Sequence, residues 1–233
     1  MKLAIMQPYF FPYIGYFQLM NAVDEFVLYD NIEFTKKGWI NRNRILANGR
    51  DTYITLPLKR DSDFRDIAER HLADIWPQER KKMLNRIIES YRKAPYFKSA
   101  FPAIEESILI DDENLFQFLF RILILIKTYL GITTPFVVST SIEIDHSLRS
   151  EEKVIAICTA RKAEIYFNPI GGLDLYSKNQ FKHNGIGLFF LKSNNIQYPQ
   201  FTNEFVPFLS IIDVMMFNSK DCIREFLSQY TIQ

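Results

Sequence analysis

The order of apolar segments in the first thirty residues places the tightest limit on the fold. Residues 2–6 (KLAIM) are a short apolar run typical of a buried strand, residues 14–22 have the composition of a short helix, and residues 25–30 (EFVLYD) are a second apolar run. A strand, a helix and a strand in this order form a βαβ unit, in which the two strands are parallel. The start of the chain therefore predicts an α/β fold.

The same alternation returns in the second half of the chain. Residues 134–140 (TPFVVST) have the character of a strand, residues 150–162 that of a helix, and residues 164–169 (EIYFNP) and 187–192 (GLFFLK) that of two further strands. Ser210 stands where it would cap a late helix. We therefore expect a mostly parallel, Rossmann-like sheet with helices between its strands.

A β-hairpin is predicted for residues 39–58 (WINRNRILANGRDTYITLPL). Asn48-Gly49 stands between two alternating runs, and an Asn-Gly pair in such a place is a strong hairpin signal. Side chains alternate across a strand, so the first arm has two faces. One face carries Ile40, Arg42 and Arg44, and the other carries Asn41, Asn43 and Ile45.

A helical block is predicted between the hairpin and the later strands. Its apolar periodicity indicates three helices, over about residues 77–92, 98–108 and 114–130. We interpret residues 76–131 as a helical insert in a single domain that spans residues 1–233. The apolar run at residues 115–131 is interrupted by two basic residues and is shorter than the ~20 residues of a membrane span. It therefore predicts a buried helix and no membrane insertion.

Composition limits the partners and the cellular compartment that we expect for the protein. The formal net charge of +1 gives no long-range field that would attract nucleic acid. Cys158 and Cys222 form no C-x-x-C pattern, and the apolar run after Lys2 is too short for a signal peptide, so we expect a cytoplasmic protein with reduced thiols. The three histidines lack the spacing of metal ligands, so no metal site is predicted.

Ligands of parallel α/β sheets bind beyond the carboxyl ends of the strands. Four segments are expected at that edge: residues 7–16, the residues from Asp30 onward, residues 139–146 and residues 168–176. Their convergence follows from the order of the elements alone.

The segment QPYFFPYIGYF, at residues 7–17, follows the first strand and is rich in aromatic rings. Its prolines fix the path of a loop, and Gly15 allows close approach at the start of the helix. Phe10, Phe11 and Phe17 are interpreted as core residues. Gln7, Tyr9, Tyr13 and Tyr16 are interpreted as polar tips that line a pocket with Asp30 and Arg42.

Other patterns carry candidate chemistry, each with a plainer alternative. Gly171-Gly172 lets the backbone approach a ligand, or forms an ordinary tight turn. Asp30 is interpreted as a carboxylate that binds a ribose hydroxyl, a metal or an amine. The alternative is that Asp30 caps a turn. Arg42 is interpreted as a partner of phosphate or carboxylate, and Trp39 as a ring that stacks on a base or sugar. The alternative is that both residues belong to a solvated arm of the hairpin. His146 is the histidine best placed for acid–base work, or a surface residue.

These segments resemble those of one known family, the WbqC-like proteins. The resemblance is carried by QPYFFPYIGYF at residues 7–17, DEFVLYDNIEFTKKGWINRNRI at 24–45, APYF at 94–97, IGGLDLY at 170–176, IQYPQF at 196–201 and FVPFLSIIDVMMFN at 205–218. Because these motifs run from one end of the chain to the other, the resemblance covers the whole protein.

The resemblance implies a cytoplasmic step in bacterial surface-polysaccharide (O-antigen, lipopolysaccharide) biosynthesis. The step it favours is a transferase reaction that acylates, for example with a glycyl group, the amine of a nucleotide-linked amino sugar. Asp30, Arg42 and His146 are then expected to be catalytic. Substrate binding is expected at Gln7, Tyr9, Tyr13, Gly15, Tyr16, Trp39, Asn41, Asn43, Gly171, Gly172, Tyr176, Tyr198 and Gln200. The hypothesis predicts one cleft that joins the first loop, residues 39–42 and the Gly171-Gly172 loop. The partner is the nucleotide sugar, and a homo-oligomer is left open.

Two other functions stay open. A more distant similarity, to class I synthetases and pantothenate synthetases, favours an adenylate-forming ligase or nucleotidyltransferase that uses ATP and a divalent metal near Asp30. Those enzymes open a helix with H-x-G-H, whereas Tyr13-Ile14-Gly15-Tyr16 stands here, and tyrosine cannot bring the positive charge of histidine to a phosphate. The K-M-S-K-S loop is also missing, with only YSKNQF at residues 176–181 as a faint counterpart. The other function is that of a non-catalytic protein that binds sugars or partners.

Overall fold

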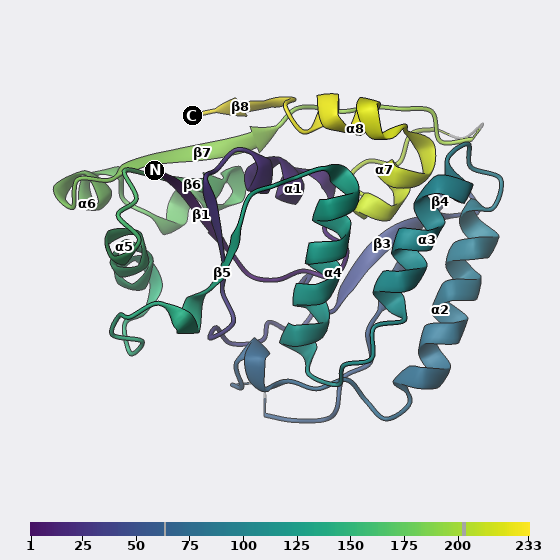
Figure 1. The fold of residues 1–233 in the computed structure, drawn as a ribbon, viewed down its shortest axis with the longest axis horizontal. Helices are drawn as coiled ribbons and strands as arrows, with labels where there is room; N and C mark the ends of the chain where they lie inside the picture. Colours follow the sequence, from purple (N-terminus) through teal and green to yellow (C-terminus); the bar gives the residue numbers. More distant parts are fainter. Residues whose placement is uncertain (63, 202–203) are drawn as a thin grey trace.

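A six-stranded sheet organises the protein (Figure 1). The computed structural model describes residues 1–62, 64–201 and 204–233. The strands are β1 (Lys2–Met6), β2 (Glu25–Leu28), β5 (Phe136–Val138), β6 (Ile165–Pro169), β7 (Gly187–Ser193) and β8 (Tyr230–Ile232), in the spatial order β5-β2-β1-β6-β7-β8. All neighbours are parallel except β7 and β8, which confirms the predicted α/β fold with a mostly parallel sheet.

The parallel strands follow a doubly wound order. Numbered along the chain, the five of them are arranged 3-2-1-4-5, so the direction of winding reverses between β1 and β6. Ligands of doubly wound sheets bind at the carboxyl ends of the strands near this reversal. The loop that leaves β1 at Met6 and the loop that leaves β6 at Pro169 both begin at this edge.

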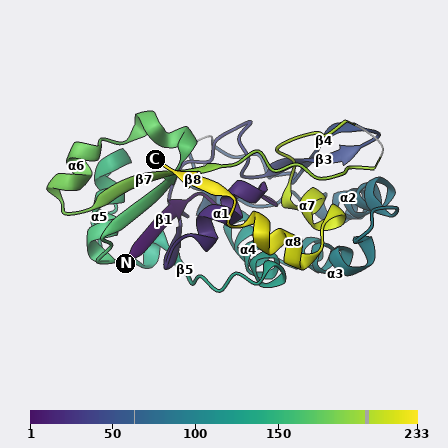
Figure 2. The ribbon, with the colours of Figure 1, turned by 90° about the horizontal axis from the view of Figure 1, so that it is seen from above.

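Helices cover both faces of the sheet because side chains alternate across each strand. From β1, Ala4 enters the larger apolar cluster, whereas Leu3 and Ile5 enter the smaller one. The larger cluster is completed by α1 (Ile14–Asn21), α4 (Leu115–Leu130), α7 (Ile211–Phe217) and α8 (Lys220–Phe226). The smaller cluster is completed by α5 (Ser150–Ala160) and α6 (Lys178–His183). Figure 2 shows α5 and α6 at one end of the molecule and the hairpin with α2 (Trp76–Tyr91) and α3 (Phe97–Ile108) at the other.

The predicted hairpin and helical block are both present. Strands β3 (Arg42–Ala47) and β4 (Arg50–Thr55) pair around Asn48 and Gly49, whose φ angles of 53° and 74° are those of the two-residue turn that an Asn-Gly pair favours. The helical block contains α2 (Trp76–Tyr91), α3 (Phe97–Ile108) and α4.

The helical block shares its core with the sheet. Ile104 of α3 and Ile122 of α4 belong to the same apolar cluster as Ala4 of β1. The organisation as one domain with an insert stays a prediction. Within the described ranges, no helix has the length and apolar character needed to cross a membrane.

Candidate functional site

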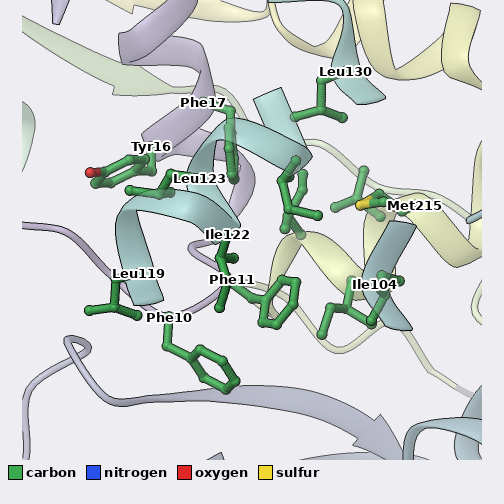
Figure 3. Close-up of a cluster of buried hydrophobic side chains, with 14 of the residues drawn as sticks. Phe10, Phe11, Tyr16, Phe17, Ile104, Leu119, Ile122, Leu123, Leu130 and Met215 are labelled. Carbon is green, nitrogen blue, oxygen red and sulfur yellow. The ribbon is translucent and has the colours of Figure 1, made fainter. Parts of the chain in front are cut away.

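Half of the loop after β1 belongs to the core. Phe10, Phe11 and Phe17 are fully buried, as predicted, and lie against side chains of α3 and α4 (Figure 3). Tyr16 is buried with them, and its hydroxyl donates a hydrogen bond to the carbonyl oxygen of Gln7 at 3.0 Å. Tyr16 is therefore a packing residue, which corrects its predicted place among the polar tips of the loop.

The same loop is held in a strained conformation. Phe11 has a φ of 42°, in a region that bulky residues rarely adopt. The side-chain amide of Asn43, on β3, donates to the carbonyls of Phe10 and Phe11 at 3.1 and 2.9 Å. The hydroxyl of Ser210, which caps α7 as predicted, also donates to Phe11 at 2.8 Å. The hairpin and α7 therefore fix the loop before any ligand arrives.

An aromatic pocket lies beside this loop. Its volume is about 160 Å³, and its walls come from the loop after β1, the first arm of the hairpin and the segment before α7. The lining residues are Tyr9, Pro12, Tyr13, Trp39, Asn43, Arg44 and Phe208. We refer to this set as the aromatic pocket.

Glycine 15 determines where the ring of Tyr13 lies. A Cβ atom at position 15 would meet the ring of Tyr13 at 2.4 Å, so only glycine leaves room for the ring in this place. Gly15 thus acts on the pocket through Tyr13, and the predicted close approach at the helix start is made by a side chain of the protein.

The phenols of the pocket are neutral hydrogen-bonding groups. Burial raises the pKa of Tyr9 and of Tyr13 above the ordinary value, so neither hydroxyl loses its proton near neutral pH. Trp39 is 39% exposed and stacks on Tyr53, with ring centroids 6.3 Å apart. The pocket therefore offers flat apolar surfaces with neutral polar edges, which suit a ring-bearing ligand.

The cation at the pocket is Arg44. Arg42, for which pairing with phosphate or carboxylate was expected, stacks on Tyr53 and donates to the carbonyls of Gly38 and Lys37. It is not a lining residue of the pocket. Arg44 lies on the same strand face two residues later. Sequence alternation places both arginines on that face, but it cannot say which one meets the pocket.

A second polar cluster lies at the carboxyl edge of the sheet, around the buried carboxylate of Asp30. Its Oδ1 accepts hydrogen bonds from the Ser139 hydroxyl at 2.6 Å and the Thr140 amide at 3.1 Å, and its Oδ2 accepts from the Thr140 hydroxyl at 2.7 Å. Ser139 and Thr140 follow β5, so Asp30 joins the ends of two neighbouring strands. Both carboxylate oxygens already have donors in this arrangement.

Asn31 connects this cluster to His146. Its Oδ1 lies 2.7 Å from the Ser139 hydroxyl, whose single proton is shared between Asn31 and Asp30, and its Nδ2 lies 3.0 Å from Nδ1 of His146. Since Nδ2 is a donor, Nδ1 of His146 is assigned as the acceptor, and Nε2 then donates to the carbonyl of Ile142 at 3.0 Å. Asp30 and His146, both predicted to be catalytic, thus belong to one network, which we call the carboxyl-edge network.

Lys153 of α5 completes the carboxyl-edge network, and sequence reasoning missed it. It is only 3% exposed, its Nζ donates to the carbonyl of Asn31 at 3.3 Å, and its ammonium lies 5.0 Å from the ring centroid of Tyr29. Burial lowers the pKa of Lys153, and Asp66 partly offsets this. In the described parts of the chain, no cluster of three or more His, Cys, Asp or Glu side chains could hold a metal ion.

The Gly171-Gly172 loop is separate from the aromatic pocket. It forms a 3₁₀ helix (Ile170–Leu175), and a Cβ atom on Gly172 would lie 1.9 Å from Nδ2 of Asn168, whereas one on Gly171 would meet nothing within 4 Å. Gly172 thus makes room for a buried side chain. Tyr176, at the end of this helix, packs edge-on against Tyr166.

Tyr198 and Gln200 hold a buried carboxylate. Asp213 accepts from the hydroxyls of Tyr91 and Tyr198, both at 2.8 Å, and from the Gln200 amide at 2.7 Å. The remaining groups of the Gln200 side chain bond to the main chain of Val206. Gln200 is buried and its side-chain amide anchors Asp213 and Val206, while its role in substrate binding stays a prediction.

The structure thus divides the predicted site into parts. Tyr9, Tyr13, Trp39 and Asn43 meet in the aromatic pocket, together with Arg44 and Phe208, which sequence reasoning missed. Among the described residues, neither the Gly171-Gly172 loop nor Asp30 lines this pocket, so the single cleft stays a prediction. The side chain of Asn41 instead binds the hairpin by donating to the Leu56 carbonyl at 2.9 Å.

The comparisons with known proteins agree with the sequence motifs. The sequence model of the WbqC-like protein family matches residues 7–225, which include every lining residue of the aromatic pocket. The chain is 28% identical over 218 residues to "Uncharacterized protein Rv1507c" of Mycobacterium tuberculosis, and this similarity covers 92% of each chain. No solved structure matches this protein. The family match spans nearly the whole chain, and the protein belongs to the WbqC-like protein family.

Proposed function

We propose that this protein is a transferase of surface-polysaccharide biosynthesis that acylates the amine of a nucleotide-linked amino sugar. The observation that carries the proposal is the aromatic pocket, whose volume of about 160 Å³ suits a single ring. An apolar cavity of about 150 Å³ accommodates a benzene ring, and sites for whole ligands are usually larger, about 300–1,000 Å³. The pocket would therefore hold one ring of the substrate, with the rest of the substrate outside it.

The reaction needs few specialised groups. The sugar amine attacks the carbonyl carbon of an activated acyl donor, a new C–N bond forms, the bond to the leaving group breaks, and the amine nitrogen gives up a proton. Holding the two reactants together can supply much of the rate enhancement. Asp30 and His146 are the groups we assign to orienting the amine and accepting its proton, for which Nδ1 of His146 would exchange the hydrogen bond it accepts from Asn31 for one from the amine.

The direct test is a transfer assay. The purified protein is incubated with a panel of nucleotide-linked amino sugars and activated acyl donors, and the sugar products are analysed by mass spectrometry. We expect one product whose mass has increased by an acyl group, a raised KM for Tyr13→Ala and a lowered kcat for His146→Ala. Polysaccharide from a deletion strain should lack the same acyl group. An unchanged polysaccharide would contradict the proposal, and binding without transfer would favour a non-catalytic sugar-binding protein.

ATP-dependent adenylation is the second candidate, and the strand order favours it. The 3-2-1-4-5 arrangement is that of doubly wound nucleotide-binding sheets. Within Tyr13-Ile14-Gly15-Tyr16, however, Tyr16 is buried, so only Tyr13 could reach a phosphate. Release of pyrophosphate from ATP in the presence of amino acids would support adenylation, and no release across a broad panel would set it aside.

A further inference from the structure

We infer that the ligand of the aromatic pocket carries an anionic group, a phosphate or a carboxylate, and that Arg44 binds this group. The inference deepens the proposed function and rests on it for the kind of ring that enters the pocket. The requirement for an anion comes from the pocket itself, from the unpaired donors of Arg44 and the charges around it.

The guanidinium of Arg44 is placed to meet a ligand. It lines the aromatic pocket and lies 5.6 Å from the ring centroid of Trp39, a ring that also lines the pocket. The Arg44 side chain is 25% exposed, so it is partly desolvated and still reachable. A ring stacked in the pocket would therefore bring its substituents next to this cation.

The donors of Arg44 are incompletely used. A guanidinium has five N–H donors. Nη1 donates to Asp51 at 2.9 Å, Nη2 makes a long contact of 3.4 Å with the carbonyl of Phe208, and the buried Nε has no partner in the described structure. A partly desolvated cation with free donors favours a further acceptor, and a bidentate anion supplies two.

Asp51, the present ion-pair partner of Arg44, competes only weakly with a ligand anion. Asp51 lies on the opposite strand of the hairpin, and its side chain is 43% exposed. Ion pairs at such exposed positions contribute little to stability because water screens them. Among the described residues that line the pocket none is acidic, so a ligand anion would meet Arg44 without repulsion from these walls.

Arg42 provides a matched control on the same strand. It also stacks on an exposed aromatic ring, that of Tyr53 at 4.7 Å, but it does not line the pocket. Its Nε donates to the carbonyl of Gly38 at 3.1 Å, and Nη2 donates to that of Lys37. The two arginines thus share residue type, strand and face, and they differ in access to the pocket.

The experiment compares charged and neutral probes with the same rings. Binding of N-acetylglucosamine 1-phosphate and uridine 5′-diphosphate is measured by calorimetry against N-acetylglucosamine and uridine, on the wild type, Arg44→Met, Arg44→Lys and Arg42→Met. At least one anionic probe should bind the wild type more tightly than its neutral counterpart. We expect Arg44→Met to weaken that binding about tenfold or more, Arg44→Lys to weaken it less, and Arg42→Met to change it less than about twofold.

The outcomes separate this inference from the proposed function. Equal binding of charged and neutral probes, no binding of any anionic probe, or equal losses in Arg44→Met and Arg42→Met would overturn the inference. Anion binding through Arg44 in a protein that transfers no acyl group would support the inference and contradict the proposed function. Acyl transfer that is unchanged in Arg44→Met would support the proposed function and contradict the inference. Thermal unfolding of each variant checks that it is folded. If Arg44→Met does not fold, the comparison is made with Arg44→Lys.

Discussion

The side-chain amide of Asn43 lies 2.9 Å from the carbonyl oxygen of Phe11, whose φ of 42° is strained. Such a backbone conformation costs about 1–3 kcal/mol and persists only when the surrounding structure enforces it. Here a residue of the hairpin enforces the path of the loop after β1. Because Tyr9 and Tyr13 lie on either side of Phe11, this contact also fixes two walls of the aromatic pocket.

Replacing Asn43 with alanine should loosen both the loop and the pocket. The substitution removes two hydrogen bonds to the carbonyls of Phe10 and Phe11, which are buried. We expect a loss of about 1–3 kcal/mol in the free energy of unfolding, measured by urea denaturation, and weaker binding of pocket ligands.

Asn41→Ala is the control for this prediction. The amide of Asn41 also donates to a main-chain carbonyl, that of Leu56, but within the hairpin. Its loss should lower stability without a comparable effect on ligand binding. If the two variants lose ligand affinity equally, the loop is not fixed through Asn43.

Gly15→Ala should change the pocket more than the stability of the fold. The new methyl group would lie 2.4 Å from the ring of Tyr13, so this ring must move, while alanine suits the helix better than glycine by about 0.5–1 kcal/mol. We expect reduced ligand affinity in calorimetry and little change in the melting temperature. In a Tyr13→Ala background the same substitution should have no further effect on affinity, and an added loss there would show that Gly15 acts by another route.

The two glycines of the Gly171-Gly172 loop should differ sharply in their tolerance of alanine. A Cβ atom on Gly172 would lie 1.9 Å from Nδ2 of the buried Asn168, and shifting that side chain should cost about 1–3 kcal/mol. At Gly171 the methyl group meets nothing within 4 Å, so denaturation should be unchanged. Equal stabilities of the two variants would contradict this assignment.

Asp213 should make stability depend on pH. Burial raises its pKa to about 6, although hydrogen bonds from Tyr198, Tyr91 and Gln200 oppose the rise. The folded state therefore binds a proton more tightly than the unfolded state, whose carboxyl has the ordinary pKa of 3.8. The contribution of this group is fully present below pH 4 and is lost as the pH rises to about 6, a decrease of roughly 2–3 kcal/mol.

Asp213→Asn isolates that contribution. The variant has no titrating carboxyl at this position, whereas all other groups remain. We measure the free energy of unfolding of both proteins by urea denaturation from pH 4 to pH 7. The stability of the wild type relative to the variant should fall as the pH rises. A difference that does not vary with pH would show that Asp213 does not titrate as assigned.

The secondary structure could be predicted from sequence because its signals are local. The turn at Asn48-Gly49, the strand–helix–strand order of the first thirty residues and the three helices between Trp76 and Leu130 each depend on residues close together in the chain. The same holds for the aromatic character of the pocket, since Tyr9, Tyr13 and Trp39 stand out in the sequence. Their motifs also sufficed to indicate the family.

Only the tertiary structure decided which polar side chains face the aromatic pocket. Arg42 and Arg44 have the same residue type and lie on the same strand face, yet Arg44 alone lines the pocket. The side-chain amide of Gln200 donates a hydrogen bond to Asp213. Lys153 is buried against Tyr29, and these two residues are more than 100 positions apart in the sequence. The physical reason is that a polar group is available to a ligand only if no other segment has satisfied it, and those segments are brought together by folding.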